Sequence, residues 1–401
     1  MYIERPIYLD KIKNYKDSNG IIKIITGIRR SGKSTLFKIY QDYLLKNGIS
    51  KEQIININFE DIENERLLDY HLLYDYVKSK IINDNMYYVF FDEIQNVVNF
   101  QKVLNTLCLK ENIDLYVTGS NAYLLSGELA TFLSGRYIEI KMYPLSFKEY
   151  CSFFKNNENN DKESLFNNYL KFGAFPYILK YNQNEQDILL YLETIYNSII
   201  LKDVIQRNNI NYPTRLEKLI MFLFNNIGSL TSINNIRNQM LSDNFKIDSS
   251  TIENYINALM NSFIIYKVPR YNISGKELLK TNDKYYVADT GLKYFLLHNF
   301  EKDRGHLLEN VVYLELLKRS YKVYVGKINE FEVDFIAEKG EERVYIQVSE
   351  TLASDETRER EFKPLKIIKD NYEKIILTMD KIFLGNVDGI KVINIIDWLL
   401  K

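Results

Sequence analysis

The chain has 401 residues, of which 46% are hydrophobic, so it is long enough to bury several packed cores. The charges of its 52 basic and 53 acidic residues nearly cancel, which removes the simplest argument for nucleic-acid binding. Any contact with DNA would have to come from a local basic patch. Two cysteines and three histidines exclude a disulfide framework and a structural zinc site. No apolar run approaches the roughly 20 residues that cross a bilayer, and the first ten residues lack a secretory-signal pattern, so we expect a cytoplasmic protein without a membrane span.

The first third of the chain alternates between β-rich and helical segments. The expected strands are Ile22–Thr26, Ile54–Asn58, Tyr87–Phe91 and Leu115–Thr118, and the expected helices are Lys33–Lys46, Leu67–Ile82 and Phe100–Leu109. This alternation predicts an α/β fold in which helices cover a parallel sheet. Ligands of such sheets bind at the carboxyl ends of the strands.

A phosphate-binding motif follows the first of these strands. Gly27-Ile-Arg-Arg-Ser-Gly-Lys-Ser34 has the glycine, lysine and serine spacing of a P-loop, and it stands between a strand and a helix as that motif requires. Backbone N–H groups would cradle the phosphates of ATP, Lys33 would reach the β- and γ-phosphates, and the Ser34 hydroxyl would bind Mg²⁺. The residues predicted to contact nucleotide are Gly27, Arg30, Ser31, Gly32, Lys33, Ser34 and Thr35.

Polar residues at the ends of later strands complete the predicted hydrolytic site. Asp92 and Glu93 follow an apolar strand, where Asp92 would hold the magnesium shell and Glu93 would polarise the attacking water. Ser120 or Asn121 would sense the γ-phosphate, and the sequence does not separate the two. Arg136 precedes the β-run Tyr137–Met142, where it could stabilise the transition state at a neighbouring subunit's ATP or form an ion pair within its own domain.

The pattern changes after residue 145. Residues 146–211 are largely helical and are broken at Lys171–Pro176, which predicts a helical lid. Residues 212–285 contain three helical patterns, the third opening with the capping-box spacing Ser250-Thr-Ile-Glu253, before the β-run Phe263–Val268. This order predicts a winged helix. Residues 286–401 form a second, smaller α/β domain, with a helix at His306–Arg319 and strands at Lys322–Val325, Glu332–Ala337 and Val344–Ser349.

These motifs together resemble the prokaryotic AAA-type (AAA+) P-loop ATPases that carry a C-terminal domain of unknown function. The matching segments are Gly27–Thr35, Phe91–Gln95, Thr118–Ser120, Leu133–Arg136, Tyr143–Phe147, Gly173–Pro176, Tyr286–Leu292 and Glu309–Asn310. The resemblance implies an ATPase core at residues 1–145 and homo-oligomers that bind ATP at the subunit interface. It therefore favours Arg136 as a residue acting in the neighbouring subunit, and it implies a mechanism more than a cellular purpose.

The tail is similar to a degenerate PD-(D/E)xK nuclease fold. That fold places an acidic residue on one strand and an acidic or amide ligand on the next, followed two residues later by a lysine, and the matching positions here are Asp334, Gln347 and Ser349. Period-two alternation puts Glu332 on the strand face of Asp334, and Glu309 could add a carboxylate. Because Ser349 cannot supply the charge of the lysine, a binding or scaffold role is favoured over cleavage. Two candidate substitutes, Lys327 and Lys339, have no sequence feature that places them at the site.

Three functions remain open from the sequence. The first is a Mg²⁺-dependent, oligomeric ATPase coupled to the handling of DNA. The second is an ATP-gated switch or adaptor that acts on a protein partner, which gains support because the presumed recognition helix, Ser250–Met260, offers Asn254 and Asn257 but no lysine or arginine. The third is a metal-dependent nuclease licensed by ATP through Glu309, Asp334 and Gln347.

Overall fold

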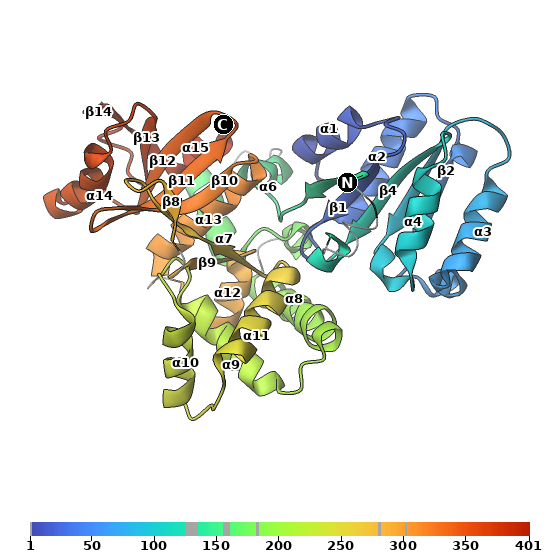
Figure 1. Ribbon diagram of the computed structural model, residues 1–401. Helices are drawn as coiled ribbons and strands as arrows, with labels where there is room; N and C mark the ends of the chain where they lie inside the picture. Colours follow the sequence, from blue (N-terminus) through green and yellow to red (C-terminus); the bar gives the residue numbers. More distant parts are fainter. Residues whose placement is uncertain are drawn as a thin grey trace. The chain divides into compact units, whose positions relative to one another are not determined.

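The computed structural model describes residues 2–125, 133, 135–154, 161–181, 184–279, 282–300 and 303–401. Ser134, within the motif Leu133–Arg136, lies outside these ranges. The chain divides into two compact units (Figure 1). The N-terminal unit comprises residues 1–142 with 261–263, and the C-terminal unit comprises residues 143–260 with 264–401.

The N-terminal unit is built on a five-stranded sheet with the strand order β2-β3-β4-β1-β5. All four neighbouring pairs are parallel, as the alternation in the sequence predicts. The strands are β1 (Ile22–Thr26), β2 (Ile54–Asn58), β3 (Tyr87–Asp92), β4 (Ile113–Gly119) and β5 (Tyr137–Lys141). Because the pairs are parallel, the carboxyl ends of β1, β3 and β4 meet at one edge.

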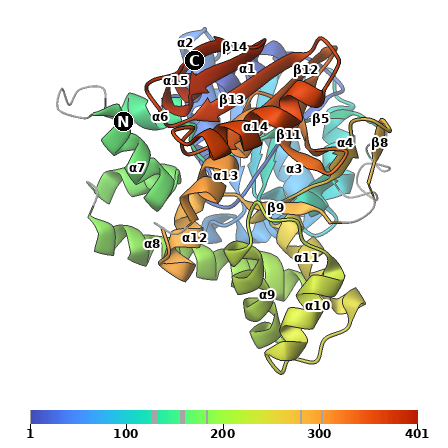
Figure 2. The same cartoon turned by 90° about the vertical axis from the view of Figure 1, so that its left-hand side faces the viewer.

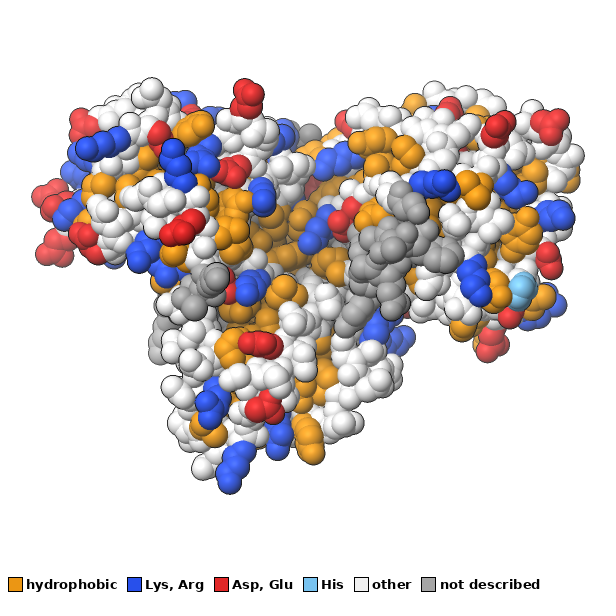
Figure 3. All heavy atoms as spheres, viewed as in Figure 1, with side chains coloured by type: hydrophobic (Ala, Val, Ile, Leu, Met, Phe, Trp, Pro, Cys, Tyr) orange, Lys and Arg blue, Asp and Glu red, His pale blue; other side chains and the backbone are white. Residues whose placement is uncertain are grey.

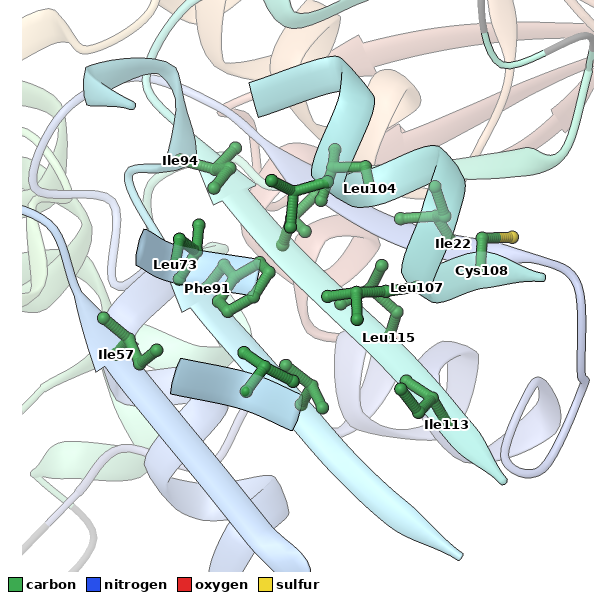
Figure 4. Close-up of a cluster of buried hydrophobic side chains, with 14 of the residues drawn as sticks. Ile22, Ile57, Leu73, Phe91, Ile94, Leu104, Leu107, Cys108, Ile113 and Leu115 are labelled. Atoms are coloured by element: carbon green, nitrogen blue, oxygen red, sulfur yellow. The ribbon is translucent and has the colours of Figure 1, made fainter. Parts of the chain in front are cut away.

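Helices cover both faces of this sheet (Figure 1). They are α1 (Pro6–Asn14), α2 (Lys33–Lys46), α3 (Tyr70–Lys80) and α4 (Phe100–Cys108), with the short turns η1 (Lys51–Gln53), η2 (Ile62–Leu68), η3 (Ile94–Asn96) and η4 (Ala122–Leu125). Side chains of α3 and α4 pack on one face with Ile22, Phe91 and Leu115 of the strands (Figure 4). Side chains of α1 and α2 pack on the other face. Burial on both faces explains why the central strands read as continuous apolar runs.

The C-terminal unit combines a helical part with an eight-stranded sheet (Figure 2). Its helices are α6 (Phe147–Phe153), α7 (Lys162–Phe172), η5 (Pro176–Tyr181), α8 (Glu185–Ser198), the π-helical η6 (Ile199–Gln206), α9 (Pro213–Asn225), α10 (Ile233–Ser242), α11 (Ser249–Asn261), α12 (Thr290–Leu297), α13 (Arg304–Lys318), α14 (Asp355–Ile367) and α15 (Ile395–Leu400). The sheet order is β14-β15-β13-β12-β11-β10-β7-β8. Its strands are β7 (Arg270–Asn272), β8 (Glu277–Leu278), β10 (Lys322–Ile328), β11 (Phe331–Lys339), β12 (Glu342–Ser349), β13 (Glu373–Thr378), β14 (Gly385–Val387) and β15 (Ile390–Asn394).

Two further strands, β6 (Ile265–Val268) and β9 (Lys284–Val287), pair antiparallel after the helices α9, α10 and α11. The assignment of residues 212–285 as a winged helix stays a prediction. The expected cap of the third helix is wrong in its detail, because α11 begins at Ser249 and Asp248 accepts the N–H of Thr251 at 2.7 Å and the hydroxyl of Ser250. An aspartate carboxylate is as good an N-cap as a serine hydroxyl. Here the aspartate is the residue directly before the first residue of α11.

Asp289 joins two of the sequence motifs inside the C-terminal unit. Its carboxylate caps α12 through the N–H of Gly291 at 2.9 Å and accepts the N–H of Ala174 at 2.6 Å. A side chain at Gly173, where φ is +80°, would collide with this carboxylate. Burial raises the pKa of Asp289 to about 7. The segments Gly173–Pro176 and Tyr286–Leu292 therefore form one buried junction.

Candidate nucleotide site and an acidic pocket

The loop between β1 and α2 has the backbone geometry of a phosphate cradle. Gly27 has a φ of +147°, and a Cβ there would lie 2.0 Å from the carbonyl oxygen of Met142. Gly32, with a φ of +104°, stands immediately before the first residue of α2. Backbone N–H groups and the N-terminus of the 14-residue helix α2 thus converge at the carboxyl end of β1. The side chains of Arg30 and Ser34 are exposed, and that of Thr35 is half-buried.

Lys33 is folded onto its own loop. Its ammonium donates to the carbonyl oxygens of Gly27 at 3.0 Å and Ile28 at 3.3 Å, and the side chain is buried. The same nitrogen lies 3.5 Å from Oε1 of Glu93. Lys33 therefore already has three acceptors, which the phosphates of a nucleotide would have to replace.

Asp92 ends β3 beside the P-loop and is buried. Thr118 Oγ1 donates to Asp92 Oδ1, and the hydroxyl of Ser34 also bonds to this carboxylate. Burial raises the pKa of Asp92, although the hydrogen bonds from Ser34 and Thr118 oppose the shift. Ser34 and Asp92 thus present a hydroxyl and a carboxylate oxygen side by side.

These oxygens fit a magnesium ion, because Mg²⁺ prefers hard oxygen ligands and is held in nucleotide sites by one or two protein groups plus phosphates. The loop next to them needs a glycine at position 27, since the backbone of Met142 fills the space that a Cβ of Gly27 would need. When bound, the ion would neutralise phosphate charge. Ser34 and Asp92 are the residues that would hold it.

Glu93 is buried one residue beyond the strand, with a φ of +55°. Its Oε2 accepts the side-chain amide of Gln95 and the backbone N–H of Ser120, the latter at 3.2 Å. Burial alone would raise the pKa of Glu93, but Lys33, the Gln95 hydrogen bond, Arg29 and Ser120 outweigh burial and lower it. The carboxylate is therefore ionised, as a base that accepts a proton from water must be. Hydrogen bonds hold it in place through its other oxygen, Oε2.

The end of β4 supplies the remaining polar groups. Ser120 and Asn121 are both buried at this edge of the sheet, so each lies where the sequence analysis placed the γ-phosphate sensor. Thr118 bridges the two acidic residues, since its hydroxyl also accepts the N–H of Glu93 at 2.9 Å. Sequence reasoning did not assign roles to Thr118 or Gln95, although both stand in the motifs Thr118–Ser120 and Phe91–Gln95.

Arg136 lies at the opposite end of the strands, where β1 and β5 begin. It directly precedes β5, whose first residue, Tyr137, pairs with Ile22 at the start of β1, and its carbonyl accepts the N–H of Ile22 at 2.9 Å. The P-loop follows the opposite end of β1. The exposed Arg136 side chain is thus separated from the P-loop of its own chain by the length of the strand.

A second candidate site is a pocket of about 670 Å³ in the C-terminal unit. Acidic side chains dominate its lining, which also includes His306, Gln347, Ser349 and Arg360; the carboxylates are Asp303, Glu309, Glu330, Glu332, Asp334, Glu350 and Glu361. The structure therefore brings together Glu309, Asp334 and Gln347, the three residues that the sequence nominates for this site.

Lys284 lies behind these carboxylates at the start of β9. Its Nζ is 2.7 Å from Glu332, 3.2 Å from Glu309 and 3.7 Å from Asp334, and only 3% of the side chain is exposed. Burial alone would lower the pKa of Lys284, but Glu309, Asp334 and Glu332 raise it well above its usual range. The sequence did not identify this lysine, because its only signal is a charged residue opening an apolar strand.

Gln347 and Asp334 are hydrogen-bonded directly beyond the last residue pair of β11 and β12, Phe335 with Ile346. Asp334 donates its N–H to Gln347 Oε1 at 2.7 Å, and Asp334 Oδ2 accepts the N–H of Val348 at 2.8 Å. In β10 and β11, Tyr324 pairs with Ile336 but Gly326 with Val333, so β11 carries one extra residue beside Asp334. Glu332 and Asp334 nevertheless lie on the same side of β11, as the alternation in the sequence predicts, since both carboxylates lie within 3.7 Å of Lys284 and line the pocket.

Two families match parts of the chain. Residues 19–151 match an AAA domain, and residues 163–303 match a domain of unknown function (DUF8612). An uncharacterized protein of Haemophilus influenzae is 40% identical over 402 residues, which cover 100% of this chain and 99% of that protein. The uncharacterized protein MJ1544 of Methanocaldococcus jannaschii is 33% identical over 365 residues, covering 87% of this chain and 79% of the relative.

A solved structure shares the fold. The Walker-type ATPase PABY2304 of Pyrococcus abyssi aligns with a TM-score of 0.52 and 16% identity, covering 74% of this chain and 96% of that one. In the described part of this chain, none of the helices combines the length and the apolar character that crossing a membrane requires.

Proposed function

Since this chain belongs to one family with the Haemophilus influenzae and Methanocaldococcus jannaschii proteins and has an AAA domain at residues 19–151, we propose that it hydrolyses ATP in a Mg²⁺-dependent reaction coupled to the handling of DNA. The observation that carries the ATPase proposal is the convergence of Lys33, Asp92 and Glu93 at the carboxyl edge of the parallel sheet. Lys33 lies 3.5 Å from Glu93, and the hydroxyl of Thr118 bonds to both Asp92 and Glu93, so the three side chains lie close enough to act on one nucleotide.

In the proposed reaction, Lys33 exchanges its loop carbonyls and Glu93 for the β- and γ-phosphates. This exchange frees Oε1 of Glu93, while Oε2 stays bound to Gln95 and to the N–H of Ser120. Glu93 Oε1 then accepts a proton from the water whose oxygen attacks the γ-phosphorus, the bond from that phosphorus to the β–γ bridging oxygen breaks, and ADP leaves. Ser120 or Asn121 contacts the γ-phosphate from the end of β4.

The proposed active state is a homo-oligomer. Arg136 supports it, because the exposed side chain lies at the sheet edge that is remote from its own P-loop. An arginine at that edge reaches a nucleotide only when a second copy presents one. Arginines supplied across an interface stabilise the charge that develops during phosphoryl transfer.

DNA is proposed as the working partner because the C-terminal unit follows three helices with the antiparallel pair β6 and β9, which is the order of elements in a winged helix. The competing candidate is a protein partner. On the face drawn in Figure 3, basic and acidic side chains are interspersed over the α9–α11 region, which matches the near-zero net charge of the chain and favours this competitor.

Steady-state ATP hydrolysis by the wild type and by Glu93→Gln tests both parts of the proposal. The assay is run with and without double-stranded DNA at low and moderate salt, since phosphate contacts weaken as salt rises. We expect Glu93→Gln to bind ATP normally and to hydrolyse it about 10²- to 10⁴-fold more slowly. Stimulation of the wild type by DNA supports the DNA partner, whereas turnover indifferent to DNA supports a protein partner. Equal turnover by the two proteins would refute the assigned site.

A further inference from the structure

The carboxylates that line the acidic pocket of the C-terminal unit need a positive charge near them. A nuclease of the PD-(D/E)xK type, which the tail resembles, holds a divalent cation between its acidic side chains. Glu309 and Glu332 come from α13 and β11, and Asp334 comes from the bulge in β11. Three carboxylates this close repel one another unless a cation lies among them.

A cation already lies there, and it belongs to the chain. The ammonium of Lys284 is within 3.7 Å of all three carboxylates and is almost completely buried. A buried ammonium is tolerated only when carboxylates pair with it, and buried carboxylates need it in the same way. Lys284 therefore places one positive charge within this cluster from a strand, β9, that contributes none of the acidic residues.

Three of the oxygens that could bind a metal are also engaged in hydrogen bonds. Glu309 Oε2 accepts the hydroxyl of Tyr286 at 2.9 Å in addition to Lys284. Asp334 Oδ2 accepts a backbone N–H, and the amide oxygen of Gln347 accepts the N–H of Asp334. Within the described ranges, no three His, Cys, Asp or Glu side chains are arranged to hold a metal ion. The residues of the pocket consequently do not fit a divalent cation.

We propose that Lys284 is the resident cation of this pocket and stands where a divalent metal ion would otherwise bind, so that the wild-type pocket takes no divalent cation. The exclusion is electrostatic and steric, because a second positive charge would have to enter beside the ammonium and displace hydrogen bonds already made. Removing Lys284 should accordingly turn the pocket into a metal site. This inference concerns the C-terminal unit alone and does not depend on ATP hydrolysis.

The test measures Mn²⁺ binding to the full chain without nucleotide, by titration calorimetry and by the loss of the free Mn²⁺ signal in electron paramagnetic resonance. The proteins are the wild type, Asp334→Asn, Lys284→Met and the double variant. Methionine keeps the length of the lysine stem and removes the charge. Lys267→Met is the matched control, because Lys267 lies on the paired strand β6 and bonds Asp283 at 2.8 Å outside the pocket.

We expect the wild type, Asp334→Asn and Lys267→Met to bind Mn²⁺ identically. Lys284→Met should gain one site that the double variant lacks, and saturating Mn²⁺ should raise its Tm by on the order of a few °C. A cooperatively melting Lys284→Met that gains no site would overturn the proposal. So would a wild-type Mn²⁺ site that disappears in Asp334→Asn, and this comparison decides the question even if Lys284→Met fails to fold.

Discussion

Lys33 and Glu93 form an ion pair across the P-loop, with 3.5 Å between Nζ and Oε1. The pair couples the residue that should bind phosphate to the residue that should activate water. The other oxygen of Glu93, Oε2, is bonded to Gln95 and to the N–H of Ser120 and not to Lys33. Nucleotide binding can therefore release one oxygen of the base without releasing the side chain.

The first prediction concerns Gln95. Its amide donates to Glu93 and helps to lower the pKa of that carboxyl group, against the effect of burial. Hydrogen bonds to charged groups contribute about 1.5–3 kcal/mol, so Gln95→Ala should reduce kcat roughly 10- to 100-fold. Because the lowered pKa keeps Glu93 ionised, activity is lost only as the pH falls through that pKa. Losing the donor raises the pKa and should move the acid limb of the pH–rate profile to higher pH.

Gln41→Ala is the control for this change, since Gln41 is a glutamine of α2 whose amide bonds Asn56 away from the site. Both variants should bind ATP like the wild type. An acid limb that stays in place in Gln95→Ala would show that the amide does not act on the base.

The second prediction concerns Gly27. A methyl group there meets the carbonyl of Met142 at 2.0 Å, and the φ of +147° is unfavourable for any side chain. Gly27→Ala should cost about 1–3 kcal/mol of stability and distort the phosphate cradle. Gly48→Ala separates the two causes, because Gly48 has a φ of +88° but open space around its Cβ position. Nucleotide affinity should fall in Gly27→Ala only, and equal affinity in the two variants would contradict the close approach.

The N-terminal unit is largely readable from the sequence, because its signals are local. β1, β2 and α2 have the predicted ends, since apolar runs and the P-loop punctuate the chain there. Lys33, Asp92 and Ser120 could be placed together because parallel strands bring their carboxyl ends to one edge. The hydrogen bond from Gln95 back to Glu93 depends on the left-handed backbone conformation of Glu93. No pattern in the sequence predicts that conformation.

The acidic pocket is less predictable, because two of its determinants are long-range. Lys284 enters from a strand 25 residues before Glu309 and 50 before Asp334, and neither spacing belongs to a helix or a hairpin. The bulge at Asp334 faces Gly326, where a Cβ would lie 2.8 Å from Val333. A lone glycine in a strand is compatible with a bulge but does not specify where the strand pairing shifts by one residue.

The third prediction concerns a buried ion pair that supports the sheet. Lys23 and Asp114 are completely buried on neighbouring strands, and Asp114 also accepts the hydroxyl of Tyr116 at 2.6 Å. Lys23→Met leaves the buried carboxylate without its positively charged partner, which typically costs about 3–5 kcal/mol. Urea unfolding should show this loss, whereas Lys38→Met, on the exposed face of α2, should change stability by less than about 0.5 kcal/mol. A similar small change in both variants would mean that the pair is dispensable.

The last prediction concerns Arg136. If its guanidinium acts at a neighbouring subunit's nucleotide, Arg136→Ala should bind ATP normally yet lose about 10³-fold or more in hydrolysis. A mixture of Arg136→Ala with Glu93→Gln then contains interfaces at which one subunit supplies an intact Glu93 and the other an intact Arg136. Activity should therefore reappear on mixing two inactive variants, and Arg66→Ala, which removes an exposed arginine of η2, should stay active throughout. Unchanged hydrolysis in Arg136→Ala would assign the arginine to its own domain, and the absence of recovery on mixing would remove the shared interface from the mechanism.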